Sequence, residues 1–172
     1  AAFILVHTFQ GERLDNSPVN AVSEWSRERA VADRVSQLDG TVTSTLEEMN
    51  LKPEDLVQWQ MENPESVLRR LWRMDPANQK NASVIALYIL HQNRNIQPLT
   101  AWREAVSFVH YSHKYDVPLT LAVAVGNAES HFDPKARSSY GAAGVMQVVW
   151  RVHSYLLMAH AGLEAEEDLG HP

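Results

Sequence analysis

Leu119-Thr-Leu-Ala-Val-Ala-Val-Gly-Asn-Ala-Glu129-Ser130 is the stretch that decides the fold, because it is an apolar run that ends on a carboxyl group. Pro118 precedes the run, and the turn His131-Phe-Asp-Pro134 follows it. Partial alternation and β-branched residues are compatible with a strand, whereas the length, the alanine content and the early proline favour a buried helix. We therefore expect a helix that presents Glu129 at the edge of an apolar wall.

A carboxyl group at such an edge keeps its proton more readily than one in water, because burial disfavours the charged form. It can then donate a proton near neutral pH, as the general acid of glycosidic bond cleavage must do. Glu129 is therefore the candidate catalytic acid and base. The alternative is a structural glutamate at a helix end, paired with Lys135 or Arg137 across the turn.

A loop of small residues follows and ends on a glutamine: Gly141-Ala-Ala-Gly-Val-Met-Gln147. Its two glycines fit positions that need unusual backbone conformations or a close approach of two chain segments. The turn between the acid and this loop contains Asp133-Pro134 and Ala136-x-Ser138. An Asp-Pro pair in a turn usually makes local hydrogen bonds, so Asp133 is interpreted as structural rather than as the second carboxyl of a two-carboxyl glycosidase.

This spaced set of motifs resembles the soluble lytic transglycosylases, which cleave peptidoglycan with a lysozyme-like catalytic domain. The resemblance lies within residues 115–148, and residues 1–97 show none. The matching residues are Glu129-Ser130, Asp133-Pro134, Ala136-x-Ser138, Gly141-Ala142 and Gly144-Val145-Met146-Gln147.

The resemblance implies a reaction with a single carboxyl group, Glu129. It protonates the leaving oxygen while the N-acetyl group of the substrate assists at the anomeric carbon. The same glutamate then removes a proton from the sugar 6-hydroxyl, which gives a 1,6-anhydro-MurNAc end without consuming water.

The resemblance also assigns substrate-binding positions, each with a structural alternative. Ser138 corresponds to a serine facing the acid and the substrate, or it caps the turn. Gln147 corresponds to a glutamine that hydrogen-bonds the substrate, or it braces the glycine loop. Met146 lines the cleft in relatives, although core packing is the simpler interpretation, and Tyr140 either stacks on a sugar or packs as an ordinary exposed aromatic residue.

Composition narrows the function further. The chain has 172 residues and a formal net charge of −6, which argues against a nucleic-acid partner. It has no cysteine, so disulfides and thiolate sites are excluded. The pair His110 and His113 lacks a third ligand at a fitting spacing and is a weak metal signal. We expect neither a metal nor another cofactor.

Helix signals recur along the whole chain, and Gln97-Pro98-Leu-Thr100 is the best boundary within it. We expect an N-terminal helical region over residues 1–97 and the N-terminal part of a lysozyme-like catalytic domain over residues 98–172. Residues 1–7 are either the stub of a removed signal or membrane anchor, or a first strand or buried arm. Helix starts are expected at Ser17-Pro18, Ser44 (a capping box with Glu47), Pro53, Pro64, Asn81, Thr100 and Val148.

The chain lacks the Ala-Tyr-Asn-type motif that follows Gly-Val-Met-Gln in the family, so it resembles a domain truncated after that segment. We therefore expect an incomplete cleft with an exposed Glu129. Apolar side chains among Val148, Leu156 and Leu157 should form an exposed patch, suited to an envelope protein partner or to self-association.

Together these features predict an all-α peptidoglycan lytic transglycosylase that acts on the MurNAc–GlcNAc β-1,4 bond of glycan strands. Its expected location is the periplasm or cell envelope of a bacterium. Two other functions stay open: a non-catalytic envelope module for glycan binding or partner docking, and a hydrolytic lysozyme.

Overall fold

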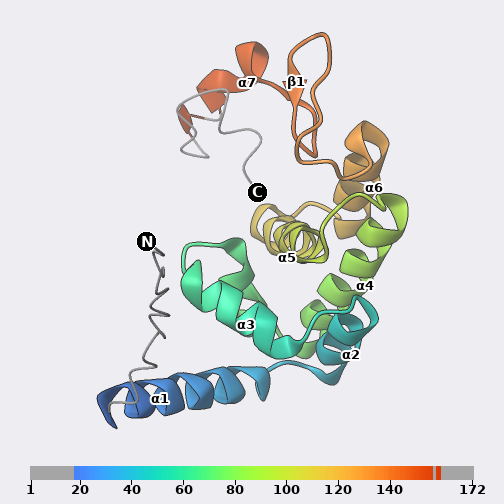
Figure 1. The fold of residues 1–172 in the computed structure, drawn as a ribbon. Helices are drawn as coiled ribbons and strands as arrows, with labels where there is room; N and C mark the ends of the chain where they lie inside the picture. The colour runs from blue at the N-terminus through green and yellow to red at the C-terminus, as the bar shows by residue number, and fades with distance from the viewer. Residues whose placement is uncertain (1–17, 157, 160–172) are drawn as a thin grey trace, which may run out of the picture.

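The computed structural model describes residues 18–156, 158 and 159, and this part of the chain is mainly α-helical (Figure 1). The predicted all-α class is confirmed, with one short antiparallel hairpin as the only sheet among the described residues. No helix there is long and apolar enough to cross a membrane. The elements are α1 Pro18–Val35, α2 Gly40–Glu48, α3 Pro53–Glu62, the 3-10 helix η1 Val67–Arg73, α4 Pro76–Gln92, α5 Pro98–Tyr115, α6 Leu119–Ser130, β1 Ala142–Ala143, β2 Val148–Val149 and α7 Trp150–Leu156.

Two of the predicted helix starts are wrong, and in both cases an aspartate further upstream is the cap. Helix α2 begins before the predicted capping box at Ser44, because the Asp39 side chain accepts a hydrogen bond from the Thr41 N–H at 2.8 Å. Helix α4 begins before Asn81, because Asp75 accepts one from the Asn78 N–H at 2.8 Å. Aspartate is among the best residues for this role, so it outcompetes the later signals.

Two other starts also differ. The segment expected to begin at Pro64 is a 3-10 helix capped by Ser66 rather than an α-helix. Val148 and Val149 pair with Ala143 and Ala142 as a strand, so the last described helix begins only at Trp150. The stretch 119–130, by contrast, is the predicted helix and not a strand.

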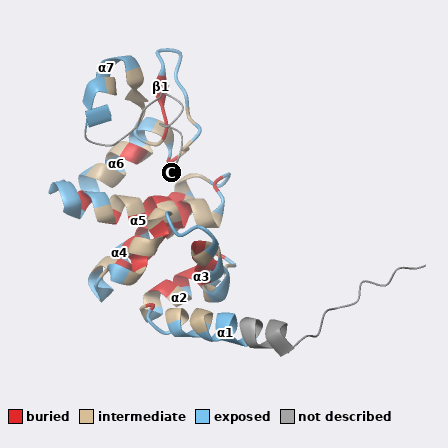
Figure 2. Ribbon diagram, turned by 90° about the vertical axis from the view of Figure 1, so that its left-hand side faces the viewer, coloured by how far each residue is buried: buried red, intermediate tan, exposed pale blue. Residues whose placement is uncertain are grey.

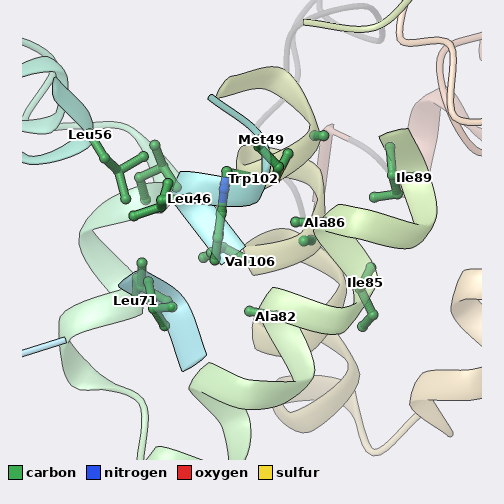
Figure 3. Packing of buried hydrophobic residues seen from close by; sticks show 14 of the residues in the cluster. Leu46, Met49, Leu56, Leu71, Ala82, Ile85, Ala86, Ile89, Trp102 and Val106 are labelled. Atoms are coloured by element: carbon green, nitrogen blue, oxygen red, sulfur yellow. The ribbon is translucent and has the colours of Figure 1, made fainter. Parts of the chain in front are cut away.

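Helix α5 lies at the centre of the fold and provides the largest buried side chain, Trp102 (Figures 1 and 3). Figure 3 shows Trp102 and Val106 of α5 among Leu46 of α2, Leu71 of η1 and Ala86 of α4. Aromatic side chains bury a large apolar area, so this cluster is a main source of folding free energy.

The same hydrophobic cluster has buried members from Leu38 to Val109, on both sides of residues 97 and 98, and also includes Phe132. Helix α5 begins at Pro98, directly after the boundary expected from the sequence, and packs on η1 and α4 as well as on α6. The division into two domains at residues 97 and 98 stays a prediction. Buried side chains on the two sides of this boundary pack against each other.

Burial falls off steeply after α5 (Figure 2). Gly126 is the one buried residue of α6, and no residue of α7 is buried. The segment that contains the predicted site therefore lies at the periphery of the helical core.

Candidate functional site

Glu129 stands exposed at the C-terminal end of α6, next to a sharp turn. The turn consists of two consecutive residues with positive φ, His131 at 51° and Phe132 at 61°. Such conformations are unfavourable for residues other than glycine, and they persist where the surroundings hold them in place. Here the Phe132 ring is fully buried and makes edge contacts with Tyr88 and Phe108, with centroid distances of 5.8 and 5.9 Å. The buried ring thus fixes the helix end at which Glu129 is displayed.

Gly126, one turn before Glu129, allows α6 to pack closely on its neighbours. A Cβ atom at this position would lie 2.7 Å from Cζ of Phe108 and 3.3 Å from side-chain carbons of Phe132 and Val145. Only a residue without a side chain fits without displacing these groups. The absence of a Cβ therefore sets the distance between α6, α5 and the loop that contains Val145.

Ser130 ties the end of α6 to that loop. Its hydroxyl donates a hydrogen bond to the carbonyl oxygen of Val145 at 2.9 Å, with the Gly126 carbonyl as a second acceptor at 3.3 Å. The residue after the candidate acid thus fixes the Gly-Val-Met-Gln segment against the helix that bears the acid.

Gln147 occupies the bracing position that the sequence left as an alternative. Its Nε2 donates to the carbonyl oxygens of Gly144 at 2.9 Å and Ala136 at 3.2 Å, and its backbone has a φ of 46°. These bonds join both sides of the loop. Its contact with substrate stays a prediction, and the bracing is what the structure contains.

Ser138 closes the loop at its other end, in the turn-capping role. Its Oγ accepts hydrogen bonds from the backbone N–H groups of Ala142 at 3.1 Å and Tyr140 at 3.3 Å. The Ser138 N–H donates to the Ala142 carbonyl at 2.9 Å. The Ser138 side chain remains exposed, so its hydroxyl is accessible from solvent.

Two further predicted residues are accessible. Tyr140 is 79% exposed at the tip of the loop, and Met146 is 41% exposed. Met146 is therefore not a core residue, contrary to the simpler of the two interpretations of the sequence. Both side chains are available to a ligand.

Asp133 makes the local hydrogen bond expected of an Asp-Pro turn. Its Oδ1 accepts from the Lys135 N–H at 2.9 Å. Among the described residues no ion pair joins Glu129 to Lys135, so that form of the structural alternative for Glu129 is not observed.

The exposure expected of an incomplete cleft is found in part. Glu129 is exposed, and Leu156 is 40% exposed. Val148 is half-buried, because it pairs with Ala143 in the hairpin, so its predicted place in an exposed patch is wrong. Leu157 lies outside the described residues.

Sequence reasoning missed a second unusual glutamate, Glu104 of α5. It is 4% exposed, and neither carboxyl oxygen has a hydrogen-bond partner. Burial is the main cause of a raised pKa at Glu104; Arg103 opposes the rise, Asp133 adds to it, and the pKa is about 8. The signal in the sequence is its position on an apolar helix face, three residues after Ala101 and four before Phe108.

The two histidines of α5 have different surroundings. His113 Nε2 lies 2.8 Å from Oδ1 of Asn78. His110 packs on the Tyr111 ring, and its pKa is lowered first by burial and then by Arg70 and Lys114. Among residues 18–156, 158 and 159, no group of three or more side chains of the metal-ligating kind comes together.

Comparison with curated proteins and comparison with solved structures each gave no match. A family model does match the C-terminal part of the chain, from the middle of α5 onward and including Glu129, Ser138 and Gln147. That family acts on peptidoglycan as lytic transglycosylases. The resemblance seen in the motifs is confirmed for this part of the chain: residues 107–169 match the transglycosylase SLT domain.

Proposed function

We propose that this chain cleaves the MurNAc–GlcNAc β-1,4 bond of peptidoglycan, with Glu129 as acid and base, and leaves a 1,6-anhydro-MurNAc end. One observation above all supports the proposal. Glu129 is displayed at the end of α6, and its neighbour Ser130 fixes that end to the loop ending in Gln147, within the segment that matches the SLT domain.

The reaction needs only one carboxyl group because it regenerates its own proton. The protonated Glu129 donates to the oxygen that leaves with GlcNAc, while the N-acetyl carbonyl oxygen of MurNAc bonds to the anomeric carbon. The resulting carboxylate then takes the proton of the 6-hydroxyl as O6 displaces the N-acetyl oxygen. The carboxyl group is again protonated, and no water enters the product.

The hydrogen bonds of the loop limit what its polar side chains can do toward a substrate. Both N–H groups of the Gln147 amide are used on backbone carbonyls, so only Oε1 is free to accept from a sugar hydroxyl or amide. The Ser138 Oγ already accepts two N–H groups, so its O–H is the group left to donate. We propose these complementary roles for Gln147 and Ser138, with the exposed Met146 and Tyr140 as apolar contacts for sugar rings.

The proposed setting is the bacterial periplasm or cell envelope, where peptidoglycan is found. A non-catalytic glycan-binding or partner-docking module and a hydrolytic lysozyme are the competing functions. The products separate all three. A transglycosylase gives anhydro ends, a lysozyme gives reducing ends that are heavier by one water, and a binding module gives neither.

The test is mass spectrometry of muropeptides released from purified peptidoglycan by the wild type and by Glu129→Gln. We expect anhydro products from the wild type and a loss of at least about 100- to 10,000-fold in the variant, the usual contribution of a general acid. Glu48→Gln, an exposed glutamate on α2, is the matched control and should be as active as the wild type. Anhydro products from Glu129→Gln at the wild-type rate would sink the assignment.

A further inference from the structure

Glu104 of α5 is an ionisable side chain in surroundings that do not stabilise its charge. It is 4% exposed, and neither carboxyl oxygen has a hydrogen-bond partner among the described residues. The guanidinium group of the neighbouring Arg103 lies over the Trp59 ring of α3, 5.4 Å from its centroid. Burying a carboxylate without hydrogen bonds costs far more free energy than burying the neutral acid. The folded chain therefore favours the protonated form of Glu104.

Glu104 faces the turn that follows α6. It lies four residues before Phe108, so the two side chains share one face of α5. The Phe108 ring contacts the buried ring of Phe132, which belongs to that turn, at a centroid distance of 5.9 Å. The next residue of the turn, Asp133, lies close enough for its charge to act on Glu104. Within the described part of the chain, Arg103 and Asp133 are the charged groups that act on this carboxyl group.

The two sides of α5 differ in how easily they admit water. Residues two positions apart point in nearly opposite directions from a helix, so Trp102 and Val106 lie on the far side from Glu104. Both are fully buried among side chains of α2, η1 and α4 (Figure 3). On the near side, α6 buries only Gly126, and the turn has two consecutive residues with positive φ, His131 and Phe132. Water therefore reaches Glu104 more easily by opening the turn than by opening the core.

We infer that ionisation of Glu104 opens the turn after α6, so that Glu104 is a pH-sensitive switch for the helix end that bears Glu129. While Glu104 is protonated, the Phe132 ring stays buried and the turn stays closed. When the proton passes to solvent, the carboxylate gains water by displacing the turn. The bond from Ser130 to Val145, which fixes Glu129 against the loop, is the adjoining contact. The switch acts on this helix end whatever reaction takes place there, so the inference does not depend on the proposed function.

The pH range of the switch follows from the surroundings of Glu104. Burial, opposed by Arg103 and assisted by Asp133, raises the pKa of Glu104 from its ordinary value of 4.5 to about 8. An opening that brings water to Glu104 therefore releases a proton at any pH well above 4.5. Such an opening becomes more favourable as the pH rises toward about 8, and it gains nothing further well above that value.

Limited proteolysis with trypsin measures the opening at Lys135, two residues after Asp133. In the closed turn the Ala136 N–H donates to the Asp133 carbonyl at 3.1 Å, and the Ala136 carbonyl accepts from the Gly144 N–H at 3.0 Å. A protease needs this segment extended and free of such bonds, so at low trypsin concentration the cleavage rate follows the open fraction. Rates at each pH are divided by those of an unstructured peptide with the same Asp-Pro-Lys-Ala sequence, which removes the pH dependence of trypsin itself.

The variants Glu104→Gln and Glu104→Leu are neutral at every pH, one with a polar side chain and one with an apolar side chain. Glu48→Gln removes an exposed carboxyl group from α2 and is the matched control. From pH 7 to pH 9 we expect cleavage at Lys135 to rise about tenfold in the wild type and in Glu48→Gln, because the open state releases the proton that the closed state retains up to about pH 8. The two neutral variants should be cut at the same rate at both pH values.

A second cleavage site separates local opening from unfolding of the whole chain. Lys80 lies on α4, which packs on α5, so its cleavage requires the core to unfold. We expect Lys80 to be cut far more slowly than Lys135 at both pH values. Equal rates at the two sites, a wild-type rate at Lys135 that does not change with pH, or the same rise in the neutral variants would each overturn the inference. Failure of the proposed reaction looks different: no anhydro ends are released, while the pH-dependent cleavage at Lys135 persists.

Discussion

Helices α5 and α6 are consecutive in the chain, yet they differ sharply in burial. Seven residues of α5 are buried, including Trp102, whereas α6 buries only Gly126. The predicted chemistry lies entirely on the less buried side, at the end of α6 and in the loop after it. Most of the apolar burial that stabilises the fold thus comes from residues 38–109, and the outer elements present accessible side chains on that support.

Removing the largest buried side chain should have the greatest effect on stability. Trp102→Ala deletes a fully buried indole, and we expect a loss of about 3–5 kcal/mol in the free energy of unfolding. Denaturant unfolding followed by circular dichroism measures it. If the core and the outer elements form one cooperative unit, anhydro-product formation should be lost at the same denaturant concentration as the helical signal.

Trp102→Phe is the matched control. The indole Nε1 is buried without a hydrogen-bond partner, so phenylalanine removes an unsatisfied donor along with some volume. It should cost much less than Trp102→Ala. Equal losses for the two variants would show that packing of the aromatic ring at this position contributes little.

The second prediction concerns Glu104, the buried glutamate of α5. Burial raises the pKa of Glu104 from its ordinary value of 4.5 to about 8 in the folded chain, so between these two pH values the folded state holds a proton that the unfolded state has lost. The cost to stability is absent below about pH 4.5, grows as the pH rises and levels off above about pH 8. Glu104→Gln should therefore be more stable than the wild type by at most about 5 kcal/mol at pH 9 and nearly equal to it at pH 4.5.

Unfolding free energies measured from pH 4.5 to 9 test this prediction. Parallel curves for wild type and Glu104→Gln would contradict a buried, proton-binding Glu104.

The third and smallest effect concerns the contact between the two helices. Gly126→Ala places a methyl group against Phe108, and we expect a loss of about 1–3 kcal/mol from overpacking. Because α6 also positions Glu129, turnover should fall along with stability. Phe108→Leu in the same chain should recover part of both losses, whereas additive losses in the double variant would exclude this contact as the cause.

For α6 and the loop after it, the sequence predicted the helix better than it predicted the hydrogen bonds within the loop. The spacing of motifs makes Glu129, Ser138 and Gln147 candidate site residues, which stay a prediction, whereas the helix predicted before them from length and composition is confirmed. That Gln147 spends both its N–H groups on backbone carbonyls depends on loop geometry that spacing does not encode. Glu104 went unnoticed because helix periodicity identifies apolar faces, while the burial of a polar residue on such a face depends on which neighbours cover it.

Helix starts show the same limit. The starts of α1 and α3 were predicted correctly from their prolines. The first N–H groups of a helix have no partner within the helix, so a proline, which has no N–H, is well suited to this position. The caps at Asp39 and Asp75 were overlooked in favour of later serine and asparagine signals, and only the observed side-chain bonds decide between them.

Helix α5 also fixes the direction in which its second half faces relative to its first half. The SLT match begins at residue 107, in the middle of this helix, whereas Trp102 lies one and a half turns earlier in the core shared with α2 and α4. Each residue of an α-helix is rotated by about 100° about the helix axis relative to the residue before it, so an insertion or deletion rotates everything that follows. One residue gained or lost between 102 and 107 would leave every motif intact and still turn Phe108, and with it α6 and Glu129, toward a different side of the molecule.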